Sequence, residues 1–474
     1  MAAKGVRHES RSLRPNAPTA ARRSARALGS SLVLALAGLL AGTSGCASHS
    51  EKMLPVRTAL DEGQPREALR LLNEAMDVKT DADLPVDLGS ENSLYILDRG
   101  SVQQSVAQFP ASQRDLEAAD KAVDMLDIAH DAKDSIGEYV FSGSSGKYQA
   151  PPHEKLLVNT LDMINYLELH DLNGARVEAR RLAVMEKYIA DDLHEQDSAA
   201  LGLGAFLAGL TFEKSDQPDE ALRWYDQALE FTGYGSLRDP VGLLMTRGSY
   251  RSPRLKDLEA GAPPARALED AGEGEIVFVV GYGRVPPKEP QRIPIGLALT
   301  MFSGALSPND VGAANRIAAQ GLVTWINFPT LGREQGAYAI PAAAIDGHYV
   351  QLEEAVNVAH EVRTEWKKIE GKIIVSAITR LVARYAAGTL VGAAAGSHSL
   401  LGTLLSLGTQ ATLTALDTPD TRSWETLPAR VAVARVRVPA GRHAIRVDAR
   451  GVIRTLNVDV DKGGWSLVSL MGLR

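Results

Sequence analysis

The chain contains a single cysteine, Cys46, and its N-terminal apolar run is too short to cross a membrane. With one cysteine in 474 residues no intramolecular disulfide can form, so the fold has to be stabilised by packing. The longest uncharged apolar stretch near the N-terminus, residues 32–40, is far shorter than the roughly 20 residues of a transmembrane helix. These two absences exclude a disulfide framework and an N-terminal membrane span.

The usual catalytic motifs are also absent. His360-Glu361 and His194-Glu195 lack the second histidine that a zincin requires, and the ten histidines show no metal-ligand spacing. Gly281-x-Gly283 has no third glycine before a helix, and no G-x-S-x-G nucleophile elbow occurs. We therefore predict that the chain is not an enzyme and uses no cofactor and no metal. The sequence does not identify a small-molecule ligand.

Cys46 stands at the end of a typical secretion leader. Arginines 22, 23 and 26 precede the apolar stretch, and Ser44 and Gly45 are the small residues before the cysteine, as in bacterial lipoprotein signals. We expect residues 1–45 to be a signal peptide and Cys46 to be acylated (palmitate among the chains), which would anchor the chain firmly in a membrane. Ala47, rather than aspartate, favours the outer membrane, with the chain on its periplasmic side.

Charge argues against nucleic acid as a partner. The whole chain has a formal net charge of −7, and removing residues 1–45, with seven basic residues and one acid, leaves −13. Such a chain would be repelled by phosphate backbones. The expected partners are the membrane, through the lipid anchor, and a protein in the periplasm.

Residues 56–255 show a loose helical repeat. In GAFLAGLTFEKSDQPDEALRWYDQALEF, Gly209 lies on a first helix and Ala221, Tyr225 and Ala228 lie on a second, which resembles a tetratricopeptide repeat (TPR). Three weaker units are centred on Gly63, Gly100 and Tyr166. Stacked helical hairpins of this kind either bind a protein or peptide in their groove or only support the fold, and the sequence leaves both open.

The remainder of the chain changes character after a Gly/Pro-rich stretch. Runs such as EIVFVV and the alternating residues 445–450 predict strands, while residues 352–390 predict a long helix interrupted near Gly371. Residues 385–416 carry no charge and space Gly388, Gly392 and Gly396 along one face; a buried helical hairpin is favoured over a membrane contact.

These patterns predict an α+β protein in which a TPR-like all-α domain precedes an antiparallel β domain with a helical insertion. The expected boundaries are: signal peptide 1–45, tether 46–55, helical repeat domain 56–255, linker 256–274, and α+β domain 275–474, with strands at 275–350 and 425–474 and helices at 351–416.

Two groups of residues are candidate contacts. Glu178, Arg180 and Arg181 could present charge towards a groove, although such runs are commonly a solvated helix face. Trp465, with Arg442 and Arg446, could contact a glycan.

A third group is predicted to be structural. In TRSWETLP, Asp420 and Arg422 are spaced for a local ion pair, and Trp424 is expected to fix the junction between helix and sheet rather than to stack on a ligand.

Several segments together resemble an uncharacterised family of bacterial TPR-like envelope lipoproteins. They are YILDRG (95–100), residues 153–181, GEIVFVVGYGRVPPK (274–288) and DTPDTRSWETLPARV (417–431). The resemblance implies a lipid-anchored envelope protein, with a link to cell-wall synthesis, and no catalytic residue. The leading hypothesis is a non-enzymatic adaptor that holds a protein partner; the alternative is a structural lipoprotein that binds peptidoglycan or another glycan.

Overall fold

Helix pairs form the N-terminal half of the part of the chain that the computed structural model describes. It describes residues 47–89, 91–122, 148, 150–191, 198–260, 266–302, 304, 306, 308–319, 325–336, 339–394 and 418–474, the side chains of 122, 302, 316–319 and 383–394 excepted. The pairs are α2 (His49–Asp61) with α3 (Pro65–Ala75), α4 (Glu91–Ser105) with α5 (Phe109–Ala122), α7 (Pro152–Glu168) with α8 (Leu172–Asp191), and α9 (Ala200–Lys214) with α10 (Pro218–Phe231). Cys46 and the end of the uncharged segment, residues 395–416, lie outside the described residues.

Local sequence explains where these helices begin. Ser48 caps α2 in a capping box with Glu51, and a proline opens α3, α7 and α10 at a position where its missing N–H costs nothing. After α10 follow η2 (Gly235–Leu237), α11 (Arg238–Arg247), α12 (Pro253–Glu259) and α13 (Leu268–Ala271).

Glycines let paired helices approach closely. A Cβ atom on Gly209 of α9 would lie 2.4 Å from Tyr225 Cδ1 of α10, and one on Gly174 would lie 2.0 Å from Tyr166 Cε1. Such distances are well inside van der Waals contact, so only glycine allows the aromatic ring to cover the backbone. Gly209 and Tyr225, which the sequence places on the two helices of one pair, are therefore in contact.

Gly209→Ala is expected to lower the free energy of unfolding by about 1–3 kcal/mol, because the added methyl group must displace the Tyr225 ring. The matched control is Gly371→Ala, since Gly371 also lies inside a helix but would place its Cβ within 4 Å of nothing. That variant should gain about 0.5–1 kcal/mol from helix propensity. Urea unfolding of both variants tests the contact, and equal effects would contradict it.

The second half of the chain forms two four-stranded sheets. The first has the strand order β10–β1–β7–β6 and the second β5–β4–β8–β9. The strands are β1 (Glu273–Tyr282), β4 (Ala342–Ile345), β5 (His348–Val350), β6 (Glu353–Val356), β7 (Arg430–Pro439), β8 (Gly441–Ala449), β9 (Val452–Val460) and β10 (Trp465–Gly472). All pairs are antiparallel except β1 with β10, which is parallel.

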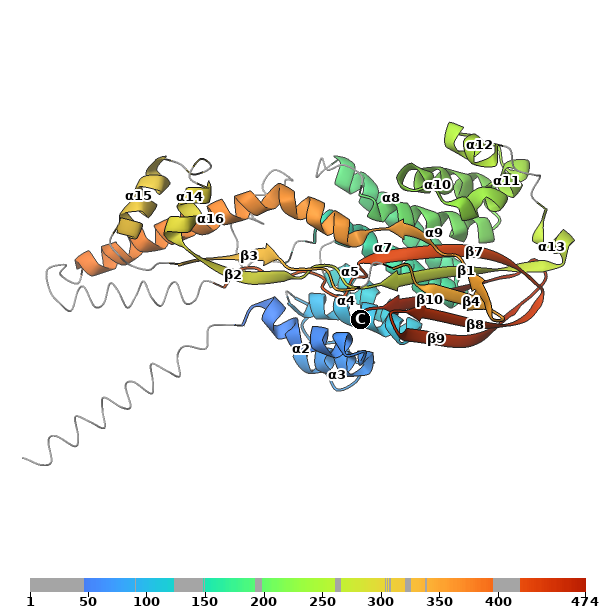
Figure 1. The fold of residues 1–474 in the computed structure, drawn as a ribbon, viewed down its shortest axis with the longest axis horizontal. Helices are drawn as coiled ribbons and strands as arrows, with labels where there is room; N and C mark the ends of the chain where they lie inside the picture. Colours follow the sequence, from blue (N-terminus) through green and yellow to red (C-terminus); the bar gives the residue numbers. More distant parts are fainter. Residues whose placement is uncertain are drawn as a thin grey trace, which may run out of the picture. The chain divides into compact units, whose positions relative to one another are not determined.

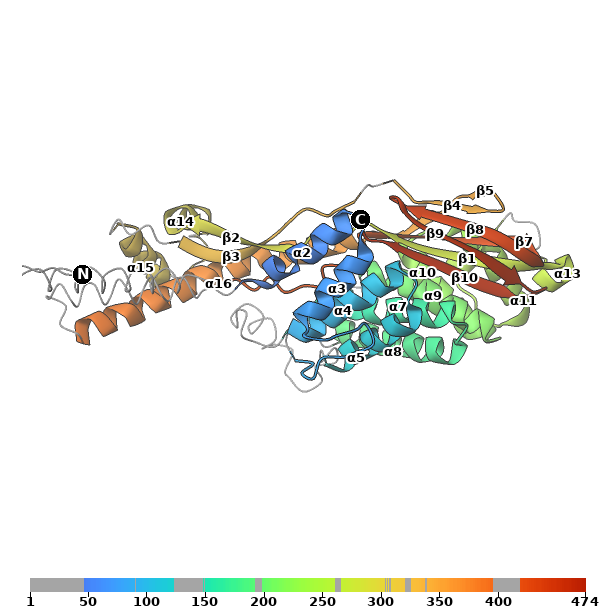
Figure 2. The ribbon, with the colours of Figure 1, turned by 90° about the horizontal axis from the view of Figure 1, so that it is seen from below.

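The β1 sheet is the middle of three layers (Figures 1 and 2). On one face, Val277 and Val279 belong to the same core as the helix pairs. On the other face, Ile276, Phe278 and Val280 pack against the β8 sheet. This double burial explains why β1 is a continuous apolar run, whereas β8 and β9 alternate because one of their faces is exposed.

A third core joins a two-stranded sheet to three helices. Strands β2 (Lys288–Pro294) and β3 (Trp325–Leu331) pair with each other. Helices α14 (Ile295–Phe302) and α16 (Val358–Ala394) pack against the strands, and α15 (Pro308–Ala319) packs against these two helices. Trp366 and Ile378 of α16 are among its buried residues. A search of the described helices finds none long and apolar enough to cross a membrane.

Several boundaries differ from those predicted. The fold is α+β, but residues 47–474 form one unit whose largest core is shared by helices and sheet, rather than two domains. Residues expected in a tether form the start of α2, and the expected linker contains the end of α12 and all of α13. The long helix begins at Val358, after strand β6, and passes Gly371 without a break. The parallel β1–β10 pair also departs from the antiparallel prediction.

Candidate interaction site

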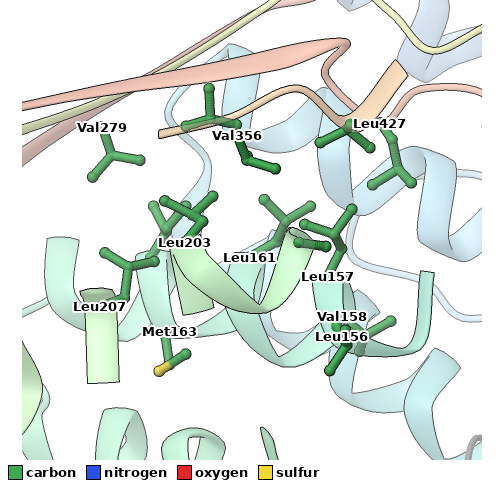
Figure 3. Packing of buried hydrophobic residues seen from close by; sticks show 14 of the residues in the cluster. Leu156, Leu157, Val158, Leu161, Met163, Leu203, Leu207, Val279, Val356 and Leu427 are labelled. Carbon is green, nitrogen blue, oxygen red and sulfur yellow. The ribbon is translucent and has the colours of Figure 1, made fainter. Parts of the chain in front are cut away.

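The inner face of the helix pairs is filled by the chain's own sheet. Leu157 and Leu161 of α7 and Leu203 and Leu207 of α9 point towards Val279, Val356 and Leu427 (Figure 3). The four leucines are at most 1% exposed, so the part of this face that the structure describes has no open apolar groove. A protein partner would have to displace the sheet to reach this face.

An irregular segment before β7, residues 421–427, is bound by polar side chains of the same helices. The Trp424 backbone N–H donates to Glu154 Oε1 at 3.0 Å, and its indole N–H donates to Ser101 Oγ at 3.0 Å. The Thr426 N–H and hydroxyl both donate to Asp98 Oδ1 at 2.9 Å. Backbone N–H groups recognised by carboxylates are the kind of contact that holds a bound peptide, here within one chain.

Further contacts close both ends of this segment. The Ser50 N–H donates to Thr421 Oγ1 at 3.0 Å, and Arg57 forms an ion pair with Glu425. Lys288 donates to the Arg422 carbonyl oxygen at 2.9 Å. The segment is therefore fixed by α2, α4, α7 and β2 together.

The carboxylates around residues 421–427 are buried away from solvent. Burial, and then the charge of Glu425, raises the pKa of Asp98 well above its usual range. Burial likewise raises the pKa of Glu425 to about 7, although Arg57 opposes the shift. Asp98, Glu154 and Glu425 are at most 1% exposed, so these acids hold the segment and are closed to a substrate in this conformation.

Glu425→Gln is expected to remove a pH dependence of stability. The pKa of Glu425 is about 7 in the folded chain and near 4.3 in the unfolded chain. Between these two pH values the folded chain binds one more proton than the unfolded chain, so the free energy of unfolding falls as pH rises through this range. We expect the variant to gain on the order of 2–3 kcal/mol relative to the unmutated chain between pH 4.5 and 7.5. Urea unfolding at both pH values measures the difference, and parallel pH profiles would contradict the assignment.

The three residues predicted at the junction lie where expected. Arg422 Nε and Nη2 donate to the two Asp420 carboxylate oxygens at 2.8 and 2.6 Å, and Trp424 has no exposed surface. Trp424 joins the helices to the strand that follows, in agreement with the structural interpretation.

The acidic and basic residues predicted on α8 divide between two faces. Glu178 is buried and accepts hydrogen bonds from Asn159 at 3.0 Å and from Arg181 at 2.9 Å. Arg180 points away from them and is exposed. Arg180 is thus exposed to a partner, whereas Arg181 is paired with the buried Glu178.

Next to Arg180, the outer face of α8 exposes two valines. Val177 is 46% exposed and Val184 is 54% exposed. The spacing of three and four residues places both on the same helix face as Arg180, and exposed Lys187 follows one turn later. We call these four residues the α8 strip.

The three predicted glycan contacts are not brought together. Arg442 and Arg446 are exposed on β8, whereas Trp465 lies half-buried on β10 with its ring 4.7 Å from the His170 ring. Trp465 belongs to the edge of the helix-and-sheet core.

A cavity of about 230 Å³ lies beside an ion network that joins α9 to the β1 sheet. Arg435 of β7 donates to both Glu213 and Glu275 at 2.8 Å, and to Tyr225 at 2.7 Å. Lys214 completes a balanced set of two cations and two anions. The network's hydrogen-bonding capacity is used internally, so it stabilises the layer contact rather than offering an unpaired charge.

Sequence reasoning missed Asp98, Glu154, Glu425 and Arg435. Their signal was weak: an acid or a base within an apolar pattern, such as Asp98 in YILDRG and Arg435 in VAVARVRV. Among the described residues no three His, Cys, Asp or Glu side chains are grouped to hold a metal ion. No family model, curated protein or solved structure matches the chain.

Proposed function

We propose that this chain is a non-enzymatic, lipid-anchored envelope lipoprotein that serves as a protein-binding scaffold through the outer face of TPR-like helix pairs. The observation that carries the proposal is the difference between the two faces of these pairs. The inner face is closed by the chain's own sheet and by residues 421–427, while the α8 strip exposes apolar and cationic side chains.

The TPR-like assignment is supported by the helix contacts. Gly209 against Tyr225 and Gly100 against Leu116 place small and large residues at corresponding positions of two of the pairs, α9 with α10 and α4 with α5. In TPR arrays the inner helices commonly receive an extended peptide. Here Asp98 and Glu154 bind an irregular segment of the same chain, so this segment occupies the place that an external peptide would have.

The α8 strip has the chemistry of a modest protein contact. Exposed valines flanked by Arg180 and Lys187 would pack against an apolar surface with acidic residues at its margin. The neighbouring helices fix the strip, since α8 packs against both α7 and α9. A rigid surface of this kind loses little conformational entropy on binding.

Membrane attachment through Cys46 is part of the proposal. Ser48 is buried and caps α2, so an acyl chain on Cys46 would be separated from the folded unit by Ala47 alone. Because two residues span at most about 7 Å, the unit would be held at the surface of the outer membrane, on its periplasmic side. Cell-wall synthesis is the process that we propose for the partner.

Arg180→Glu with Val184→Ser is expected to reduce recovery of a specific crosslinked partner at least tenfold, because charge and apolar contact are both lost. The experiment is in-cell crosslinking of the acylated protein, followed by mass spectrometry of the co-purified chains. A drop of this size, with unchanged membrane localisation and thermal midpoint, supports the α8 strip.

The matched control is Arg446→Glu with Ile453→Ser. Ile453 is 48% exposed, and both residues lie on the outer β8 sheet, far from α8 in sequence. If the control loses the partner and the α8 variant keeps it, the outer sheet is the binding face and the α8 assignment is overturned. Peptidoglycan recovered in place of a protein would favour the glycan-binding alternative.

A further inference from the structure

Strand β9 forms a long edge of the second sheet. The strand order is β5–β4–β8–β9, so β9 has a neighbouring strand on one side only. Its nine residues, VIRTLNVDV, include no proline, glycine or lysine, and one basic residue is balanced by one acidic residue. Natural edge strands are usually short or carry proline or lysine, because a row of free N–H and C=O groups pairs readily with another strand.

The other edge strands in the described part of the chain are short, bonded or interrupted by proline. Strands β5 and β6 have three and four residues. Strands β2 and β3 both contain proline. On β10, the Ser469 N–H donates to Glu168, and the Ser469 carbonyl oxygen accepts from Arg454 at 2.6 Å. Arg454 is the basic residue of β9, and this contact turns its side chain towards β10 and leaves its own edge unguarded.

The turn before β9 determines which of its backbone groups point outward. Arg450 and Gly451 both have positive φ and join β8 to β9 as a two-residue turn of type I′. Ala449 and Val452 flank the turn as a hydrogen-bonded pair, and bonded and non-bonded positions then alternate along the ladder. The N–H and C=O groups that point away from β8 are therefore those of Ile453, Thr455, Asn457 and Asp459. No hydrogen bond among the described residues uses these outward groups.

The β9 edge is complementary to itself. When two copies run antiparallel with Leu456 opposite Leu456, Ile453 faces Asp459 of the second copy. Thr455 then faces Asn457, so all the outward N–H and C=O groups gain partners. No like charges lie opposite each other in this register, because the only acidic residue of the strand faces an isoleucine.

We propose that β9 pairs with β9 of a second copy of this chain and joins the two β8 sheets into one continuous sheet. Val452, Leu456 and Val458 agree with this pairing, since they pack against the core between the sheets but are only partly buried at its margin. A second copy would cover that margin with the same apolar side chains. It is favoured over an unrelated peptide because one symmetric register satisfies every outward group. The inference goes beyond the proposed scaffold and requires neither acylation nor a periplasmic partner.

The pairing is tested on residues 47–474, which form one unit and contain no cysteine. Sedimentation equilibrium should show a reversible monomer–dimer equilibrium. Thr455→Pro removes an outward N–H and places the proline ring at the edge, without removing a hydrogen bond to β8. We expect the dissociation constant of the dimer to rise at least tenfold, with circular dichroism unchanged.

The matched control is Tyr349→Pro, on β5 at the opposite edge of the same sheet. Tyr349 follows a turn in which Asp346 and Gly347 both have positive φ, so its N–H also points outward by the alternation described above. This variant should leave the dissociation constant unchanged.

Cysteine crosslinking tests the register. Leu456→Cys should give a disulfide-linked dimer under mild oxidation, because residues opposite each other at a non-hydrogen-bonded position have Cα atoms about 4.5 Å apart, within reach of a disulfide. Ile453→Cys should remain uncrosslinked, since the two cysteines would lie six residues apart along the paired strands, about 20 Å.

Three outcomes would overturn the proposal: a chain that stays monomeric, equal effects of proline at the two edges, or crosslinking through position 453 rather than Leu456. If the chain is monomeric and Thr455→Pro instead lowers recovery of the crosslinked periplasmic partner, a strand of that partner occupies the edge. Because the purified chain meets neither partner nor membrane, a monomeric result would leave the proposed scaffold untouched.

Discussion

Trp424→Ala is expected to lower the free energy of unfolding by about 3–5 kcal/mol, measured by urea unfolding followed by circular dichroism. The indole has no exposed surface and packs in the core shared by the helix pairs and the β1 sheet. Its removal leaves a cavity and also ends the hydrogen bond to Ser101. Residues 421–427 should become more mobile together, because the cavity would lie beside the backbone N–H groups that Glu154 and Asp98 bind.

Two substitutions separate these contributions. Trp424→Phe keeps most of the apolar volume but loses the indole donor, so a cost of about 1–2 kcal/mol is expected. Trp325→Ala removes an exposed tryptophan and should cost less than about 1 kcal/mol. If Trp424→Ala were no more destabilising than Trp325→Ala, Trp424 would not join the helices to the sheet.

The local part of this junction could be read from the sequence, whereas its partners could not. Asp420 and Arg422 are only two residues apart, so their ion pair is a local contact. The burial of Trp424 follows from the large apolar surface of its side chain. Glu154 and Asp98, which bind the segment, lie 270 and 328 residues away along the chain. No periodicity or spacing records a contact over such a distance, so only the folded chain shows that the helix pairs bind their own C-terminal segment.

The same limit applies to the arrangement of the sheets. The apolar run in β1 indicated a buried strand, and the alternation in β8 and β9 indicated one exposed face. Neither pattern indicated that β10 pairs with β1 in parallel, or that helices cover one face of β1. The sequence-based prediction assigned the short strand β6 to the long helix. The pattern of four residues is too weak to be recognised beside a helix of 37 residues.

Arg435→Met is expected to cost about 3–5 kcal/mol at pH 7.5, because it leaves Glu213 and Glu275 buried with Lys214 as their only close cation among the described contacts. The control is Arg437→Met, two residues along the same strand. Arg437 is 26% exposed and pairs with the partly exposed Glu273, so its loss should cost about 1 kcal/mol or less. Urea unfolding of the two variants compares a buried network with a pair near the surface.

The pH dependence of this cost identifies its electrostatic origin. Burial alone would raise the pKa of Glu213 and Glu275, but Arg435 and Lys214 outweigh it and hold both pKa values below the usual range. In the unmutated chain these carboxylates therefore stabilise the fold above pH 4–5, and this contribution is lost as pH falls through their lowered pKa values. Without Arg435, burial should raise the pKa of these carboxylates, so the deficit of Arg435→Met should shrink as pH falls from 7.5 to 5. Adding Glu275→Gln should recover part of the loss at pH 7.5, whereas a deficit independent of both pH and Glu275 would mean that Arg435 acts through packing alone.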